Sequence, residues 1–211
     1  MTMLRWRPMD GRGEAQPPSA TKLTYDDFLS FPDDGRRHEL IDGEHFVTPS
    51  PVTVHQRLVR RLLVALDACL NSSGAGEVFH APFDVVLSKH DVVEPDLLVI
   101  LDDQTEILTE KHVRGAPAIV IEILSPGTRR RDETLKRRLY ERAGVREYWM
   151  VDPKASTVVV LGRGVGDQRT TDRSVLQTVS EFSEASDDAL TSALLPGLSL
   201  SLHDLFAEDG R

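Results

Sequence analysis

The sequence predicts a single mixed α/β (α+β) domain, and three observations lead to this prediction. Short apolar runs typical of buried strands alternate with two segments whose apolar residues recur at helical spacing. The 211 residues, 40% of them hydrophobic, suffice for one sizeable core. A single cysteine excludes an internal disulfide framework. We expect a disordered leader over residues 1–20, rich in proline, glycine and charge, and one domain over residues 21–211.

The N-terminal third should contain a short helix, a hairpin and a long helix. A threonine at the N-cap position and two acids in the first turn favour a helix over residues 24–29. Residues 38–41 and 44–47 flank the turn Asp42-Gly43, which is typical of a hairpin. Over residues 54–70 apolar side chains recur every three or four positions, which predicts an amphipathic helix.

The rest of the chain alternates strands with a second helix. An edge strand is expected first, then two largely apolar strands, a helix ended by Gly144, a short strand and further C-terminal strands. The core order is therefore helix, strand, strand, strand, helix, strand in one mixed sheet, with an N-terminal hairpin and C-terminal additions. The segments after the long helix are 77–87, 96–101, 118–124, 132–143, 147–151 and 157–161, with 162–188 irregular or weakly stranded.

Two of the apolar strands each carry one acid that such a strand should lack. Asp96 opens the run Asp-Leu-Leu-Val-Ile-Leu, and Glu122 interrupts Ala-Ile-Val-Ile-Glu-Ile-Leu. A buried carboxylate loses hydration worth several kcal/mol unless a cation or strong donors replace it. For either acid alone, an internal ion pair or solvation at the strand end is the ordinary explanation. Two acids on consecutive strands, followed by Lys136, favour a divalent-metal site.

Charge is distributed unevenly along the chain. The net charge of −9 argues against a protein that coats nucleic acid through bulk electrostatics, because phosphate binding depends on local cation clusters. One such cluster lies between residues 129 and 142, where a solvated helix face is the alternative interpretation. No apolar run is long enough to span a bilayer, and residues 1–20 contain no hydrophobic segment typical of a signal peptide. A cytoplasmic protein without membrane contact is therefore expected.

Several short motifs follow one another along the chain. They are Glu39-Leu-Ile-Asp-Gly-Glu44, Glu94-Pro-Asp96, Gly115-Ala-Pro117, Ile121-Glu-Ile-Leu-Ser-Pro126, Lys136, Gly144-Val-Arg-Glu-Tyr-Trp149 and Val151-Asp-Pro153. Together these motifs resemble the Uma-two family of restriction endonucleases, which belongs to the PD-(D/E)XK nuclease superfamily, and the resemblance runs from about Leu23 to Phe206. It implies a restriction-endonuclease-like core and a metal-dependent endonuclease that hydrolyses phosphodiester bonds in nucleic acid, with DNA the expected substrate and a homodimer the expected assembly.

The resemblance also implies roles for particular residues. Asp96 matches the PD aspartate, and Glu122 matches the acid of the (D/E)XK element, but Leu124 stands where that element has lysine. Members of this family draw the charge from the following helix, which points to Lys136. Asp96 and Glu122, with the carbonyl of Ile123, would bind Mg²⁺ or Mn²⁺. Lys136 would orient and deprotonate the attacking water or steady the developing charge.

Helical geometry tests the position of Lys136 independently. At about 100° per residue, Lys136 falls inside an apolar arc that begins at Leu135 and includes Leu139. The alternative is a lysine stem that packs on the core while its ammonium group reaches solvent. Four arginines of the basic cluster are then expected to approach the nucleic-acid backbone: Arg129, Arg130, Arg137 and Arg138.

Two further residues have competing interpretations, and a third, Glu94, has an expected orientation. Glu39 of the hairpin could ligate a metal through water or orient Lys136, as the resemblance implies, or be an exposed strand glutamate. His55 lies on the apolar arc of the long helix, where a hydrogen-bonded core histidine is usual, and the resemblance adds phosphate contact as a role. Glu94 should face outward, because strand neighbours alternate faces.

Two other functions remain open at this stage. A catalytically silent nucleic-acid-binding or regulatory module could keep the fold without turnover. A protein-partner module is favoured by the acidic overall charge.

Overall fold

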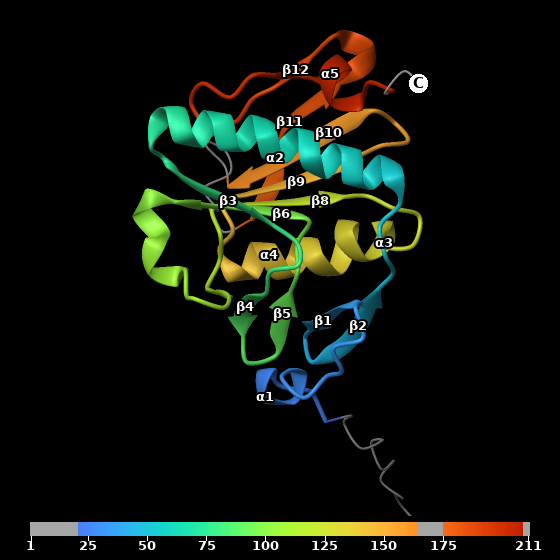
Figure 1. The fold of residues 1–211 in the computed structure, drawn as a ribbon, viewed down its shortest axis with the longest axis vertical. Helices are drawn as coiled ribbons and strands as arrows, with labels where there is room; N and C mark the ends of the chain where they lie inside the picture. The colour runs from blue at the N-terminus through green and yellow to red at the C-terminus, as the bar shows by residue number, and fades with distance from the viewer. Residues whose placement is uncertain (1–20, 164–174, 209–211) are drawn as a thin grey trace, which may run out of the picture.

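The larger of two main β-sheets forms the centre of the computed structural model, which describes residues 21–163 and 175–208 (Figure 1). The expected leader over residues 1–20 lies outside the described residues. The sequence predicts β6 (Leu97–Leu101) and β8 (Ile119–Ile123) as the two largely apolar strands and β9 (Glu147–Asp152) as the short strand after the second helix. In spatial order the six strands are β11 (Leu176–Ser183), β10 (Thr157–Arg163), β9 (Glu147–Asp152), β8 (Ile119–Ile123), β6 (Leu97–Leu101) and β3 (Gly76–His80).

A smaller five-stranded sheet contains the predicted hairpin. The hairpin strands pair with each other around the Asp42-Gly43 turn, and β1 also pairs with β5. The N-terminal helix α1 (Tyr25–Phe28) packs against this sheet and has the expected Thr24 capping box. In spatial order the strands are β2 (Glu44–Thr48), β1 (Arg37–Ile41), β5 (Asp91–Val93), β4 (Val85–Ser88) and β7 (Val113–Arg114).

Helices cover both faces of the six-stranded sheet. The long helix α2 (Thr53–Ser73) lies on one face, and the helical segment from residue 129 to residue 143 lies on the other, between the two sheets (Figure 1). That segment consists of α3 (Arg129–Arg131), a π-helical turn η2 (Asp132–Lys136) and α4 (Arg137–Ala143). The remaining elements are η1 (Asp102–Ile107), η3 (Glu184–Ser186), β12 (Ala189–Leu190), β13 (Leu200–Ser201) and α5 (Leu202–Phe206).

The side chains of the central strands alternate between the two faces. On β8, Ile119, Ile121 and Ile123 join the core under α2, while Val120 joins the core under α4. Glu122 therefore points toward α4. The same alternation runs along β6 and places Asp96, immediately before the strand, toward the same side.

The predicted fold class and core order are confirmed. The chain runs α2, β3, β6, β8, α4, β9, and β6–β8 pair antiparallel while β8–β9 pair parallel. The single strand expected over residues 77–87 is wrong, because it divides into β3 and β4, which belong to different sheets. Pro82 lies at the division and has no N–H group for a strand ladder. Within the described ranges, no helix combines the length and the apolarity needed to cross a membrane.

Replacing Gly76 with alanine is expected to lower the free energy of unfolding by more than about 2 kcal/mol. Gly76 has a φ of +151°, and a Cβ atom there would lie 2.1 Å from the carbonyl oxygen of Ile100. Gly127→Ala is the matched control, because Gly127 has open space around its Cα. Urea denaturation measures both variants, and equal stabilities would contradict the prediction.

Candidate active site

Asp96 is 3% exposed and is surrounded by donors from three different elements. Its Oδ1 accepts a hydrogen bond from Arg37 Nη1 at 2.7 Å. Its Oδ2 lies 2.9 Å from His55 Nε2 and accepts the backbone N–H of Ile123 at 2.8 Å. Burial raises the pKa of Asp96, but these donors outweigh burial and lower the pKa to about 2. Asp96 is therefore ionised, and His55 must carry its proton on Nε2 to donate to it.

Glu122 projects from β8 into the same region and is 3% exposed. Its Oε1 accepts hydrogen bonds from Lys136 Nζ and from the Tyr140 hydroxyl, both at 2.8 Å. Burial, reinforced by nearby acids including Asp132, raises the pKa of Glu122 to about 8, although Lys136 opposes this shift. The other oxygen, Oε2, receives no hydrogen bond from any residue that the structure describes, which leaves it available to a ligand.

Lys136 lies between two carboxylates. It points inward, as its place in the predicted apolar arc implies. It is 3% exposed, and its Nζ lies 2.7 Å from Glu39 Oε1 and 2.8 Å from Glu122 Oε1. The alternative of an ammonium group that reaches solvent is therefore wrong. Burial lowers the pKa of Lys136, but Glu122 and Glu39 outweigh burial and raise it above its usual value. Lys136 consequently remains a protonated donor.

Glu39 and Glu94 are both buried, contrary to the exposed alternatives. Glu39 Oε1 accepts the backbone N–H of Glu94 at 3.1 Å, and its Oε2 lies 3.3 Å from Arg131 Nη2. Burial, reinforced by Asp84, raises the pKa of Glu94 to about 7. The outward orientation expected for Glu94 is wrong, because residue 94 lies in the link where the chain passes from β5 to β6, between the two sheets.

Asp132 belongs to the site but has no assigned role in the sequence prediction. It is 2% exposed, its Oδ1 lies 4.0 Å from Lys136 Nζ, and that oxygen has no hydrogen-bond partner in the described parts of the chain. The π-helical turn places Asp132 and Lys136 inward and leaves Leu135 39% exposed, so the predicted arc is wrong at Leu135. The four-residue spacing from Asp132 to Lys136 was the available signal, but it is also the spacing of ordinary surface ion pairs.

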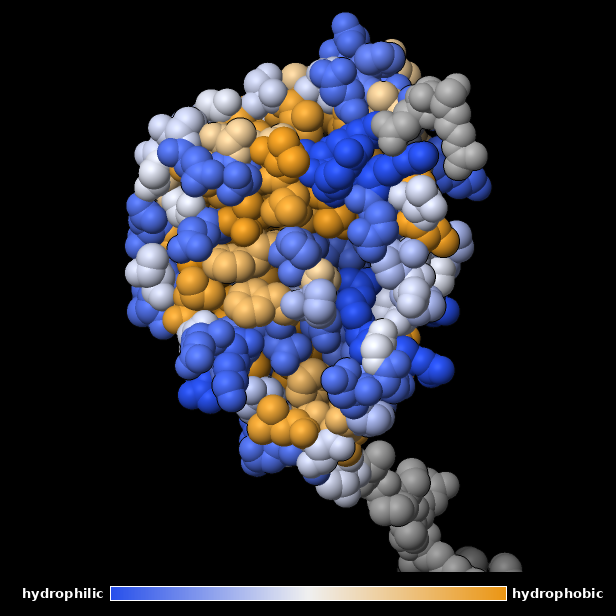
Figure 2. Space-filling model, in the orientation of Figure 1, coloured by the Kyte–Doolittle hydropathy of each residue, from blue (hydrophilic) through white to orange (hydrophobic). Residues whose placement is uncertain are grey.

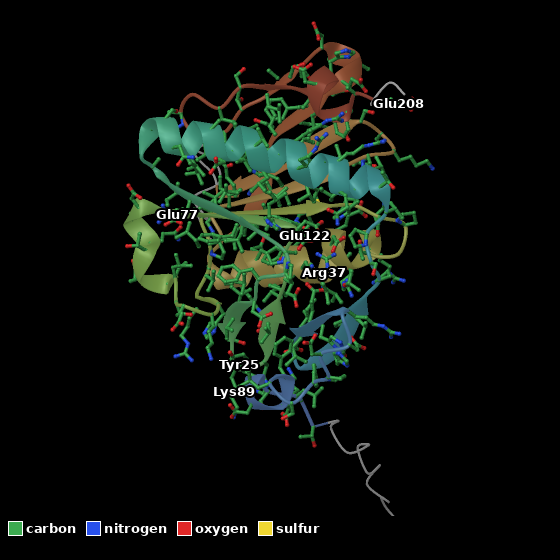
Figure 3. The ribbon with its side chains drawn as sticks, in the orientation of Figure 1. Tyr25, Arg37, Glu77, Lys89, Glu122 and Glu208 are labelled. Carbon is green, nitrogen blue, oxygen red and sulfur yellow. The ribbon has the colours of Figure 1, made fainter. Side chains whose placement is uncertain are left out.

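Several of these side chains line a cleft of about 280 Å³. Asp96, Glu122, Asp132 and Lys136 lie along it, and the loops 49–52 and 124–128 form its walls. A second cavity of about 450 Å³ adjoins it, and Arg37, His55 and Asp96 line both. Figure 3 shows Arg37 and Glu122 approaching this region from the two sheets. In the same orientation, Figure 2 shows hydrophilic side chains around this position and an apolar area to its left, toward β3.

The four arginines predicted to contact nucleic acid lie outside both cavities. Arg129 pairs with Asp152 at 2.7 Å and with Glu133 at 3.2 Å. Arg137 donates to the carbonyl of Leu176 at 3.1 Å, while Arg130 and Arg138 are exposed. The arginines at the cleft itself are Arg37 and Arg131. That Arg129, Arg130, Arg137 and Arg138 contact nucleic acid remains a prediction.

The charge balance of the site fits a divalent cation. Five buried acids face three permanent cations, so full ionisation of the acids would leave the cluster with excess negative charge. Among the described residues, three of the acids have a buried oxygen without a hydrogen-bond partner. Among the described side chains, no three from His, Cys, Asp and Glu converge on a metal position. A cation at Asp96 and Glu122 would therefore also need backbone and water oxygens. The acids are Glu39, Glu94, Asp96, Glu122 and Asp132, and the cations are Arg37, Arg131 and Lys136.

The carbonyl of Ile123 could supply one such backbone oxygen. The β6–β8 register pairs Leu97 with Ile121, so Ile123 extends beyond the last pair. Its N–H points to Asp96, and the N–H and C=O groups of one strand residue point to the same side. The oxygen set of Asp96, Glu122 and Ile123 has the hard character that Mg²⁺ and Mn²⁺ prefer.

Comparisons with known proteins agree with this architecture. A family model named Uma2, described as "Putative restriction endonuclease", matches residues 25–203. A solved structure from Anabaena variabilis, described as "a putative nuclease belonging to DUF820", superimposes with a TM-score of 0.68 at 22% identity, covering 87% of this chain and 97% of that chain. At this identity the likeness shows the fold alone. No curated protein matches the chain. The family model spans most of the sequence and names the same family that the short sequence motifs resemble. The chain therefore belongs to the Uma2 family of restriction-endonuclease-like proteins.

Proposed function

We propose that this protein is a metal-dependent endonuclease that hydrolyses phosphodiester bonds in DNA. The observation that carries the proposal is the convergence of Asp96, Glu122 and Lys136 in one cleft, two acids and a protonated lysine from segments far apart in the sequence. Membership of the Uma2 family supports a nuclease-like function. The surplus of buried acids over permanent cations around these side chains supports a divalent cation.

Asp96, Glu122 and the carbonyl of Ile123 would hold Mg²⁺ or Mn²⁺. When bound, such an ion neutralises phosphate charge, lowers the pKa of a bound water and stabilises the leaving oxygen. His55 and the Ile123 N–H hold Asp96 Oδ2 in place, and Tyr140 holds Glu122 Oε1. Glu39 positions Lys136 from the opposite side.

Lys136 would donate a hydrogen bond to the attacking water or to the phosphate oxygen that gains charge. Its raised pKa and its contacts with two carboxylates favour this donor role over the role of base, which the sequence prediction left open. Outside the cleft, the exposed Arg130 and Arg138 would contact backbone phosphates and supply salt-dependent affinity. A homodimer and a cytoplasmic location remain predictions.

The test is cleavage of labelled DNA by the purified protein in Mg²⁺, Mn²⁺ or EDTA, with RNA as the comparison substrate. We expect cleavage with either metal, none in EDTA, and a fall to background in Asp96→Asn and Glu122→Gln, because each substitution removes a carboxylate that holds the ion. Glu77→Gln is the matched control, since Glu77 is exposed on β3 away from the cleft (Figure 3). Wild-type activity in both site variants would contradict the proposal.

A further inference from the structure

Hydrolysis at this site needs a group that accepts a proton from the attacking water, and Lys136 cannot be that group. An ammonium group has three N–H donors and no acceptor lone pair. Two of the donors go to Glu39 at 2.7 Å and Glu122 at 2.8 Å. One N–H of Lys136 remains for a water molecule, and another residue must take the proton.

Asp132 has the position that this acceptor requires. Its Oδ1 lies 4.0 Å from Lys136 Nζ, which is too far for a direct hydrogen bond. Two hydrogen bonds of about 2.8 Å that meet at one water oxygen at roughly 90° span this distance. Asp132 Oδ1 is buried without a partner among the residues with described positions, and Asp132 lines the cleft together with Glu122 and Lys136.

The other acids with a free buried oxygen are placed differently. The Oε2 atoms of Glu39 and Glu94 also lack a hydrogen-bond partner among the described residues, and Glu39 Oε2 lies 3.3 Å from Arg131 Nη2. Neither acid lines the cleft that contains Glu122 and Lys136. The Tyr148 hydroxyl donates to the backbone carbonyl of Asp132 at 3.2 Å, so it fixes the main chain and does not occupy Oδ1. Burial raises the pKa of Asp132, which increases the proton affinity of the group.

An ordinary structural role does not account for this arrangement. Lys136 already has two carboxylate partners at shorter distances, so the ion pair does not need Asp132. A buried acid that serves the fold is normally hydrogen-bonded through both oxygens, because an unpartnered one destabilises the folded state.

We propose that Asp132 is a catalytic residue that binds the attacking water together with Lys136 and accepts its proton. The inference rests on the proposed nuclease function. In the step, the water oxygen forms a bond to phosphorus, and the bond from phosphorus to the leaving oxygen breaks. One water proton passes to Asp132 Oδ1, and the leaving oxygen takes a proton from solvent water.

The experiment compares Asp132→Asn with wild type and with Glu133→Gln in the cleavage assay. Glu133 follows Asp132 on the same turn, is exposed, and carries the same charge, so its substitution controls for the loss of one negative charge. We expect Asp132→Asn to lower the rate at saturating DNA by about 10²-fold or more. In Asp132→Asn, KM for DNA and the Mg²⁺ concentration that gives half the maximal rate should stay close to the wild-type values. In Glu133→Gln, the cleavage rate and both of these quantities should stay close to wild type.

Thermal melting supplies the second readout. Asp132→Asn should melt at or above the wild-type temperature, because asparagine removes a buried charge whose Oδ1 has no hydrogen-bond partner among the described residues. A lower melting temperature would assign Asp132 to the fold and overturn the inference. A wild-type cleavage rate would overturn it as well, and so would a tenfold rise in the half-maximal Mg²⁺ concentration, which would identify a metal ligand. If the wild type itself cleaves nothing, the proposed function fails and takes the inference with it, whereas an active wild type with an active Asp132→Asn removes the inference alone.

Discussion

Replacing Lys136 with methionine is expected to lower the free energy of unfolding by about 3–5 kcal/mol and to abolish cleavage. Methionine has a similar length and fills the space, so the expected loss is electrostatic. Without the ammonium group, Glu39 and Glu122 are two buried carboxylates that have lost their shared cation, and Asp132 stands nearby. Breaking a buried ion pair from one side leaves an uncompensated charge, which costs far more than the pair contributes.

Urea denaturation measures this loss, and Lys154→Met is the matched control. Lys154 is exposed in the turn after β9, so its substitution should change stability by less than about 0.5 kcal/mol. A triple variant, Lys136→Met with Glu39→Gln and Glu122→Gln, should recover most of the stability and none of the cleavage. If Lys136→Met unfolds with the same free energy as Lys154→Met, the charges around Lys136 are exposed to solvent, which would contradict a buried charge cluster.

Replacing Arg37 with alanine is expected to tighten Mn²⁺ binding at least tenfold. In the structure, the guanidinium group of Arg37 lies 2.7 Å from Asp96 Oδ1 and lines the cleft. A divalent ion that binds Asp96 must compete with this positive charge for the carboxylate. Removing the guanidinium group frees one oxygen and leaves the site more negative, and both changes favour the ion.

Calorimetric titration of Mn²⁺ into wild type, Arg37→Ala and Arg36→Ala tests this prediction. Arg36 precedes Arg37 and carries the same charge but pairs with Asp34 at 3.7 Å, away from Asp96. Arg36→Ala therefore reports the general effect of one lost cation, and its affinity for Mn²⁺ should differ from wild type far less than that of Arg37→Ala. Asp96→Asn added to Arg37→Ala should remove the gain. Equal affinities in the two arginine variants would contradict direct competition at Asp96.

Much of the site could be predicted because its signals are local. Asp96 and Glu122 are evident in the sequence, since an acid inside an apolar run is costly wherever the strand is buried. The inward position of Lys136 follows from helical periodicity. Glu39 and His55 also reach the site, and each makes the buried polar contact that was one of its two interpretations.

Other parts could not be predicted because they depend on irregular backbone and on long-range packing. A π-helical turn changes the periodicity of one helix by a single residue, so the count that placed Lys136 correctly placed Leu135 wrongly and gave Asp132 no role. The outward orientation of Glu94 assumed a continuous strand, whereas the chain crosses between sheets there. The pairing of Arg37 with Asp96 joins residues 59 positions apart, which no periodicity encodes.

The candidate site straddles both sheets, and this division gives the N-terminal hairpin a share in the chemistry. The proposed metal ligands lie in β8 or directly before β6 of the six-stranded sheet, but Arg37 and Glu39 come from β1, and Thr48 of β2 accepts from Arg131 at 2.8 Å. A shortened chain that began at α2 would keep every residue of the proposed oxygen set but would lose Glu39, one of the two carboxylates that pair with Lys136. The hairpin is thus a component of the proposed reaction centre, and we expect a minimal version of this fold to require it.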